Sequence, residues 1–387
     1  MKAAAILLSS LFVIGTAAPA RAQLGALGRI KKAADKAADA KNKYDDLNIT
    51  DEEERQLGDK VSEKLREHFG VYQNEAVTKY VTLVGTALAL SSTRATLNWR
   101  FIVLDTDGVN AYAAPGGVVH VTRGLLGLMK NESELAGVLG HEITHVTAKH
   151  TVRAIQKSKG VTMASSEVGP GGNLRQSFLS KFGEVIFTRV YEGEFSREDE
   201  NDADEGGVRL ANTLGYAPNG MVDVLKKIDA RNGSREDRNG LFASHPATAD
   251  RIEKLEKLIK ADKLTGAATV EARYKATITF DAKPASEIAV DDSGAAGLAS
   301  GDKKKDDDKK ADGKDKDKDK KDEPKKGRFG LGGITGGKQT QAAQQTASAG
   351  ARGGVPDRDA KGGPNKNALV VKVSAAELEA FKKGIAS

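Results

Sequence analysis

Apolar residues recur at intervals of three and four over residues 51–69 and 74–91. This spacing predicts two amphipathic helices. Two shorter stretches, Trp99–Leu104 and Val118–Thr122, are rich in β-branched and aromatic residues, and the second follows Pro115-Gly116-Gly117. This composition, and the turn residues before the second stretch, are typical of strands, so we expect a strand at each.

The pattern predicts a longer helix from about Glu132 to Lys157. Asn131 suits its N-cap position, and Glu134 follows three residues later. Ser196 suits the cap of another helix, and Gly215 its end. The remaining helical patterns cover about residues 174–193, 197–214, 218–231 and 246–262.

The last third of the chain changes character. Residues 270–280 alternate between apolar and polar, which predicts a half-buried strand. From 291 to 365 the chain has Lys/Asp blocks and then Gly, Gln and Ala, so we expect a disordered linker. A second strand is predicted at 368–373, paired with the first, and Ser374 and Glu377 form a capping box for a final helix.

The first 22 residues read as a cleaved signal peptide, because Lys2 precedes a short apolar run and Ala20-Arg21-Ala22. We therefore expect cleavage after Ala22 and a periplasmic location. The chain has no cysteine, which excludes disulfides and lipid attachment at cysteine. Its formal charge is +6. An exported protein is not expected to bind nucleic acid, so the surface is either simply solvated or weakly attracted to an anionic membrane.

The strongest chemical signal is His141-Glu142-Ile143-Thr144-His145, which lies within a predicted helix. Residues four apart differ by about 40° around a helix, so both imidazoles point to one place. Zinc takes neutral nitrogen ligands in a tetrahedron, and this spacing supplies two. Glu142 would reach a water there and act as general base. The alternative is a surface helix with incidental histidines, but the apolar residues 135–140 before His141 argue against it.

A hydrolytic zinc site needs a third protein ligand. His150 lies nine residues after His141, about 180° around the same predicted helix, so we interpret it as a residue of another helix face. Glu200 and Asp204 lie one helical turn apart and share a face. One carboxylate could bind zinc while the other accepts from a ligand histidine. Acid-rich helix starts are also common for electrostatic reasons, so spacing alone leaves this open.

Over about residues 50–262 the sequence resembles the M48 zinc metallopeptidases. The resemblance rests on several segments in the family's order. These are Asn110–Gly117, Thr122–Leu126, Glu134–Ala136 leading into the histidine motif, Ser196-Arg197 with Glu200 and Asp204, and Ser244-His245-Pro246 before Arg251-Ile252.

The resemblance implies an α+β fold: a mainly helical zincin-type metallopeptidase domain with a small β-sheet. It implies that His141, His145 and Glu200 bind one Zn²⁺ and that Asp204 supports a ligand histidine. It also implies an edge strand near Gly116–Val121 that borders the active site and pairs with an extended substrate.

Residues Asn110, Gly116, Gly117 and Val118 would then bind substrate, although Asn110 and the glycines could instead only shape a turn. His245 could stabilise the oxyanion, bind zinc as an inhibitory fourth ligand, or only cap a helix.

The expected organisation has six parts: 1–22 signal peptide, 23–49 amphipathic lead-in helix, 50–264 peptidase domain, 265–290 strand segment, 291–365 disordered linker, and 366–387 strand–helix segment. Residues 151–195 contain no apolar span, so the chain resembles the soluble, exported members.

We expect an endopeptidase acting on unfolded or misassembled cell-envelope proteins. The alternative is a chaperone-like or scaffolding factor with a latent zinc site. The sequence does not give the oligomeric state.

Overall fold

The computed structural model describes residues 49–159, 186–191, 195–232, 248–287, 289–291, 344–346 and 365–385. Contacts divide the chain into Met1–Ile49 and Thr50–Ser387, and the second unit is described here. The predicted signal peptide, nearly all of the lead-in helix, most of the linker and His245 lie outside the described residues.

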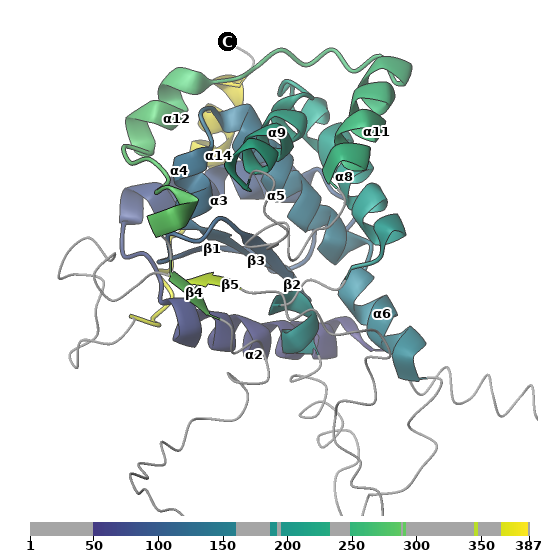
Figure 1. Cartoon of the computed structure of the whole chain (residues 1–387), viewed down its shortest axis with the longest axis vertical. Coiled ribbons are helices and arrows are strands. Elements are labelled where there is room, and N and C mark those ends of the chain that lie inside the picture. Colours follow the sequence, from purple (N-terminus) through teal and green to yellow (C-terminus); the bar gives the residue numbers. More distant parts are fainter. Residues whose placement is uncertain are drawn as a thin grey trace, which may run out of the picture. The chain divides into compact units, whose positions relative to one another are not determined.

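The elements follow the predicted order through most of the domain (Figure 1). Thr50 forms a capping box at the start of α2, and Asn131 and Ser196 cap α5 and α8 as predicted. The bounds are α2 Asp51–Phe69, α3 Glu75–Leu90, β1 Arg100–Leu104, β2 Ala111–Ala114, β3 Val118–Thr122, α4 Arg123–Leu128, α5 Glu132–Thr147, α6 His150–Lys159, α8 Arg197–Thr213, α9 Gly220–Asn232, α11 Thr248–Ala261, α12 Glu271–Thr277, the 3₁₀ turn η1 Ala285–Glu287, β4 Ala289–Asp291, β5 Gln344–Thr346 and α14 Ala375–Lys383.

The main sheet has the strand order β1-β3-β2. Strand β3 pairs in parallel with β1 and antiparallel with β2, so it is the central strand. The prediction of an edge strand near Gly116–Val121 is therefore wrong in position, and the edge next to α5 is β2. Sequence reasoning missed β2 because Ala111–Ala114 is only four residues long and contains three alanines, which have a low preference for strands.

The sheet is covered on both faces (Figure 1). Alternate residues such as Phe101, Val119 and Val121 belong to the hydrophobic core shared with α3 and α5. On the other face His120 lies 2.9 Å from the Ser62 hydroxyl of α2, and Tyr112 stacks on Phe69. All strand residues except Arg100 are buried, which makes the sheet a rigid support for the helices above it.

Glycines allow α5 and α8 to cross closely. A Cβ added at Gly207 would lie 2.5 Å from the backbone nitrogen of His141, and one added at Gly140 would lie 2.7 Å from the carbonyl oxygen of Gly207. Real Cβ atoms do not approach backbone so closely, so this separation requires glycine at both positions. The crossing brings the start of α8 against the histidine motif of α5.

The predicted single helix from Glu132 to Lys157 is wrong, because α5 ends at Thr147 and α6 begins at His150. Lys149 between them has φ 55°, a left-handed conformation that costs a non-glycine residue roughly 1 kcal/mol. Its ammonium group forms ion pairs with Asp51 and Glu54, and Arg94 donates to the carbonyl of Val146. These contacts at the end of α5 stabilise the break, and no sequence period reveals them.

The strand predicted at 270–280 is also wrong, since Glu271–Thr277 forms helix α12. The buried residues there are Tyr274 and Ile278, four apart, which is a helical spacing. The Tyr274 hydroxyl donates to the carbonyl of Leu126, and the half-buried Arg273 forms an ion pair with the buried Glu132. The alternation was misleading because the alanines at 272 and 276 are exposed and favour helix as much as any residue.

The end of the chain packs against the domain without the predicted strand pair. Residues 368–373 form no strand, and the segment that was to pair with them is α12. The predicted capping box of Ser374 and Glu377 is confirmed at the start of α14. Phe381 and Ile385 join the main core. Within the predicted linker, Gln344–Thr346 forms strand β5, which pairs with β4 and was not predicted.

Candidate metal centre

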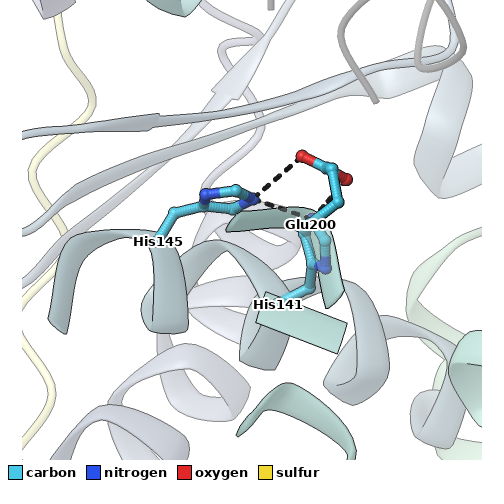
Figure 2. Close-up of side chains that lie close together, drawn as sticks. All are labelled: His141, His145 and Glu200. Carbon is cyan, nitrogen blue, oxygen red and sulfur yellow. Dashed lines mark hydrogen bonds and ion pairs between the residues drawn. The ribbon is translucent and has the colours of Figure 1, made fainter. Parts of the chain in front are cut away.

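The side chains of His141 and His145 from α5 and of Glu200 from α8 converge (Figure 2). The two histidine Nε2 atoms lie 3.0 Å apart. The carboxylate of Glu200 lies 3.7 Å from His141 Nε2 and 3.4 Å from His145 Nε2. Each residue is at most 2% exposed. Within the described residues, this group offers one ligand atom from each member, all within 4.8 Å of one another.

Two helices position the group. The histidines lie one turn apart on α5, and Glu200 lies in the first turn of α8, where the Ser196 cap fixes the start of the helix. The helix dipole also favours a carboxylate there. Because Gly140 and Gly207 let the helices approach, the carboxylate reaches both imidazoles.

Asp204 contacts the first histidine. Its Oδ1 is 2.9 Å from Nδ1 of His141, so the other ring nitrogen, Nε2, faces Glu200. Arg251 of α11 donates two hydrogen bonds of 2.7 Å to Asp204 and lies 3.0 Å from Glu200 Oε2. Burial alone would raise the pKa of Asp204, but the Arg251 guanidinium outweighs it and holds that pKa below its usual range.

Sequence reasoning gave Arg251 no role in the site. The residue is 2% exposed, and the carboxylates of Asp204 and Glu200 raise its pKa despite burial. The guanidinium therefore stays charged and orders both acids. Apart from its place in the family resemblance, its sequence signal is a basic residue in a predicted helix, which is usually a solvated position.

Glu142 follows the first histidine on α5 and is 1% exposed. Its charge contributes to raising the pKa of Arg251 and of Tyr112. The carboxylate is thus buried from water and electrostatically coupled to Arg251, which contacts Glu200.

The structure contradicts the interpretation of His150 as a residue of the opposite helix face. The break at Lys149 brings its Nδ1 to 2.9 Å from Nδ1 of His145, and its Nε2 to 2.9 Å from Asp202. His150 is fully buried. The ring of Phe195 covers His145, with the ring centroids 4.1 Å apart.

The predicted substrate residues lie around β2 and its turn. Asn110 precedes β2, and its side chain accepts from the N–H of Ala111. The Gly116 N–H donates to Glu54, and the Gly117 carbonyl accepts from Arg100. Val118 is in the central strand. These bonds favour the turn-shaping alternative for the two glycines, both of which have positive φ.

A small depression joins the edge strand to the metal-ligand group. Its lining includes Ala113 and Pro115 from the end of β2, together with His145 and Lys149. The other predicted active-site residue, His245, lies outside the described residues. Arg251, six positions later, is the first residue after it that the structure places at the site.

The sequence profile of peptidase family M48 matches residues 75–259, which contain all of the residues that converge here. Residues 75–259 belong to peptidase family M48. The matched part begins at α3 and ends near the end of α11.

Several M48 peptidases are similar in sequence to this chain. The mitochondrial metalloendopeptidase OMA1 of Schizosaccharomyces pombe is 30% identical over 184 residues, covering 46% of this chain and 52% of that protein. The β-barrel assembly-enhancing protease of Escherichia coli is 29% identical over 212 residues, covering 52% and 42%. The metalloprotease LoiP of Escherichia coli is 28% identical over 193 residues, covering 49% and 73%. The chain spans about half the length of the first two relatives.

None of the helices in the described ranges combines the length and hydropathy that a membrane span needs.

Proposed function

We propose that this M48 chain is a zinc-dependent endopeptidase in which His141, His145 and Glu200 hold one zinc ion. One observation carries the proposal. In a buried group the two histidine Nε2 atoms lie 3.0 Å apart, Glu200 Oε2 lies 3.7 Å from His141 Nε2, and Glu200 Oε1 lies 3.4 Å from His145 Nε2. A tetrahedral zinc ion with bonds of about 2.1 Å places its ligand atoms about 3.4 Å apart. The donor set, two imidazoles and a carboxylate, is one that catalytic zinc uses while keeping a position open.

A bound zinc ion would acidify a water molecule and polarise the scissile carbonyl. Glu142 is the general base in this proposal. Its carboxylate takes a proton from the water as the water oxygen bonds to the carbonyl carbon, and it delivers that proton to the amine nitrogen as the C–N bond breaks. Because water is the nucleophile, no covalent acyl intermediate forms.

Arg251 and Asp204 have a supporting role. Arg251 donates to Asp204 and lies beside Glu200, so it fixes the carboxylate that faces His141 and the one that completes the ligand group. We propose that His245 donates a hydrogen bond to the oxyanion. Metal binding and helix capping are the alternatives.

Strand β2 is the proposed platform for substrate. The backbone N–H of Thr122 donates to the carbonyl of Asn110, so the alternation of an antiparallel pair turns the backbone groups of Ala111 and Ala113 away from β3. The Asn110 side chain already accepts from the Ala111 N–H. Ala113, at the depression beside His145, is then the residue with which an extended peptide pairs.

Recognition through backbone bonds selects extended rather than folded chains. We therefore propose unfolded or misassembled cell-envelope proteins as substrates and the periplasm as the compartment. The signal peptide predicted for residues 1–22 and the name of the Escherichia coli relative, a β-barrel assembly-enhancing protease, support this.

The test compares wild type and Glu142→Gln as mature proteins from Gln23, each assayed for zinc content and for cleavage of unfolded casein. Both should bind about one zinc, and only wild type should cleave. Normal cleavage by zinc-loaded Glu142→Gln would contradict the assignment of the base. The scaffold alternative predicts that Glu142→Gln keeps the cellular effect of the protein.

A further inference from the structure

His145 has one ring nitrogen at the metal-ligand group and one directed away from it. Its Nε2 lies 3.0 Å from His141 Nε2 and 3.4 Å from Glu200 Oε1. Figure 2 shows this side of the ring facing both residues. Its Nδ1 lies 2.9 Å from Nδ1 of His150. The far side of the His150 ring continues the chain of contacts, with Nε2 2.9 Å from Asp202 Oδ2 and 3.7 Å from Asp199 Oδ1.

The proton positions along this chain follow from metal binding. A histidine binds a metal through a nitrogen without a proton, so His145 carries its proton on Nδ1. Nδ1 of His150 must then accept that proton in a hydrogen bond, and His150 carries its own proton on Nε2. The Nε2–H donates to Asp202. One arrangement of tautomers satisfies both contacts, and it presents the metal-binding nitrogen of His145 to the site.

The two ligand histidines are thus supported in different ways. His141 contacts the buried carboxylate of Asp204 directly. On its Nδ1 side His145 contacts His150, which in turn contacts the carboxylate of Asp202, a side chain that is 59% exposed. Metal-binding histidines usually contact a carboxylate or carbonyl with the second nitrogen. Here an imidazole occupies that place.

The break between α5 and α6 makes the contact between His150 and His145 possible. Helix α5 ends at Thr147, and the left-handed Lys149 turns the chain so that His150 begins α6 against His145. In an uninterrupted helix the two rings would point in different directions. His150 is fully buried, and the ring of Phe195 packs on His145 from the start of α8.

We propose that His150 is a positioning residue for the metal centre: it orients His145 by accepting from its Nδ1–H and donating to Asp202. This rests on the proposed metal-binding role of His141, His145 and Glu200. The competing explanation is that His150 only anchors α6 to α8, in which case its loss would affect stability and leave metal affinity unchanged.

Three variants separate these explanations. His150→Phe fills the space but accepts no hydrogen bond. His150→Asn places its Oδ1 near the position of the original Nδ1 and restores the acceptor. Val152→Ala, a buried position of the same helix, loosens α6 without touching the chain of contacts. Zinc dissociation constants are measured by competition with a chelator, and metal-free stability by urea unfolding.

We expect His150→Phe to weaken zinc binding by about 10- to 100-fold. His150→Asn should bind within about threefold of wild type, and Val152→Ala should lose stability but keep its zinc affinity. Equal affinity of wild type and His150→Phe would overturn the proposal. So would an equal loss in the Phe and Asn variants.

A spectroscopic measurement is independent of whether His150→Phe folds. Long-range ¹H–¹⁵N spectra of the zinc-loaded wild-type protein, labelled at histidine, should place the His145 proton on Nδ1 and the His150 proton on Nε2. The opposite tautomer at His150 would contradict the proposal. His145→Ala separates the proposed zinc site from the proposed role of His150. Wild-type zinc affinity in that variant would refute the zinc site itself.

Discussion

The approach of α5 and α8 can be tested with a single methyl group, in the variant Gly207→Ala. The new Cβ would lie 2.5 Å from the backbone nitrogen of His141 and 2.8 Å from the carbonyl carbon of Gly140. Ordinary contact begins at 3.4 Å, so the helices must separate by about 0.9 Å. Glu200 is carried on α8, and metal–ligand distances tolerate only about 0.2 Å. The displaced carboxylate would no longer complete the ligand group.

We expect zinc affinity to fall by at least roughly 100-fold in Gly207→Ala, beyond the effect of losing a supporting contact. The free energy of unfolding of the metal-free protein should change less than the free energy of zinc binding. Overpacking costs about 1–3 kcal/mol, and replacing glycine by alanine within a helix returns about 1 kcal/mol. The measurements are zinc titration against a chelator and urea unfolding without metal.

Gly206→Ala is the matched control. Its Cβ would meet the side chain of Thr144 rather than backbone, and a side chain can move aside. It should therefore keep most of the zinc affinity. Wild-type affinity in Gly207→Ala, or an equal loss in both variants, would refute the argument that the glycine crossing sets the position of Glu200.

Three further predictions concern stability. Burial lowers the pKa of His120 to about 3, so unfolding takes up a proton below pH 6.5, and the protein loses stability as the pH decreases. Between pH 7 and pH 4.5 the free energy of unfolding of wild type, measured with urea, should fall by roughly 3 kcal/mol more than that of His120→Gln. Arg251→Met leaves the buried Asp204 and Glu200 without their cation and should destabilise the metal-free protein by about 3–5 kcal/mol, with unchanged stability contradicting the ion pairs. Phe381→Ala should cost about 3 kcal/mol by calorimetry or urea unfolding because its ring packs in the core, whereas Lys382→Ala should cost little.

The helices were predictable where local signals agreed. Asn131 and Ser196 cap the helices that carry the ligands. Asn131 was recognised from its residue type and from Glu134, and Ser196 from its residue type. The i, i+4 spacing of His141 and His145 gave their convergence directly, because both lie on one uninterrupted helix. These features depend on residues close in sequence, so the sequence was sufficient.

The remaining features depend on contacts between distant residues. The break before His150 is stabilised by Arg94 and by the partners of Lys149 on α2, and helical periodicity continues through it unchanged. The place of Arg251 beside Asp204 depends on how α11 packs on α8. Neither arrangement has a sequence spacing that distinguishes it from a solvated helix face.

The sheet shows the same limit. Two of its strands were predicted from their β-branched residues, but Ala111–Ala114 has too few such residues to be recognised. The family resemblance placed the edge strand near Gly116–Val121, whereas β2 pairs with β3 on its outer side. The alternation of residues 270–280 was real, yet burial of Tyr274 and Ile278 selected a helix.

The most direct test of the central claim is to remove metal from the mature protein with a chelator and then titrate zinc back while following casein cleavage. The account predicts that cleavage disappears, returns in full at one zinc per chain, and fails to return in Glu142→Gln although that variant binds the same single zinc. Cleavage that persists without metal, or that survives in His141→Ala, would contradict the proposal that this group of residues holds the catalytic zinc.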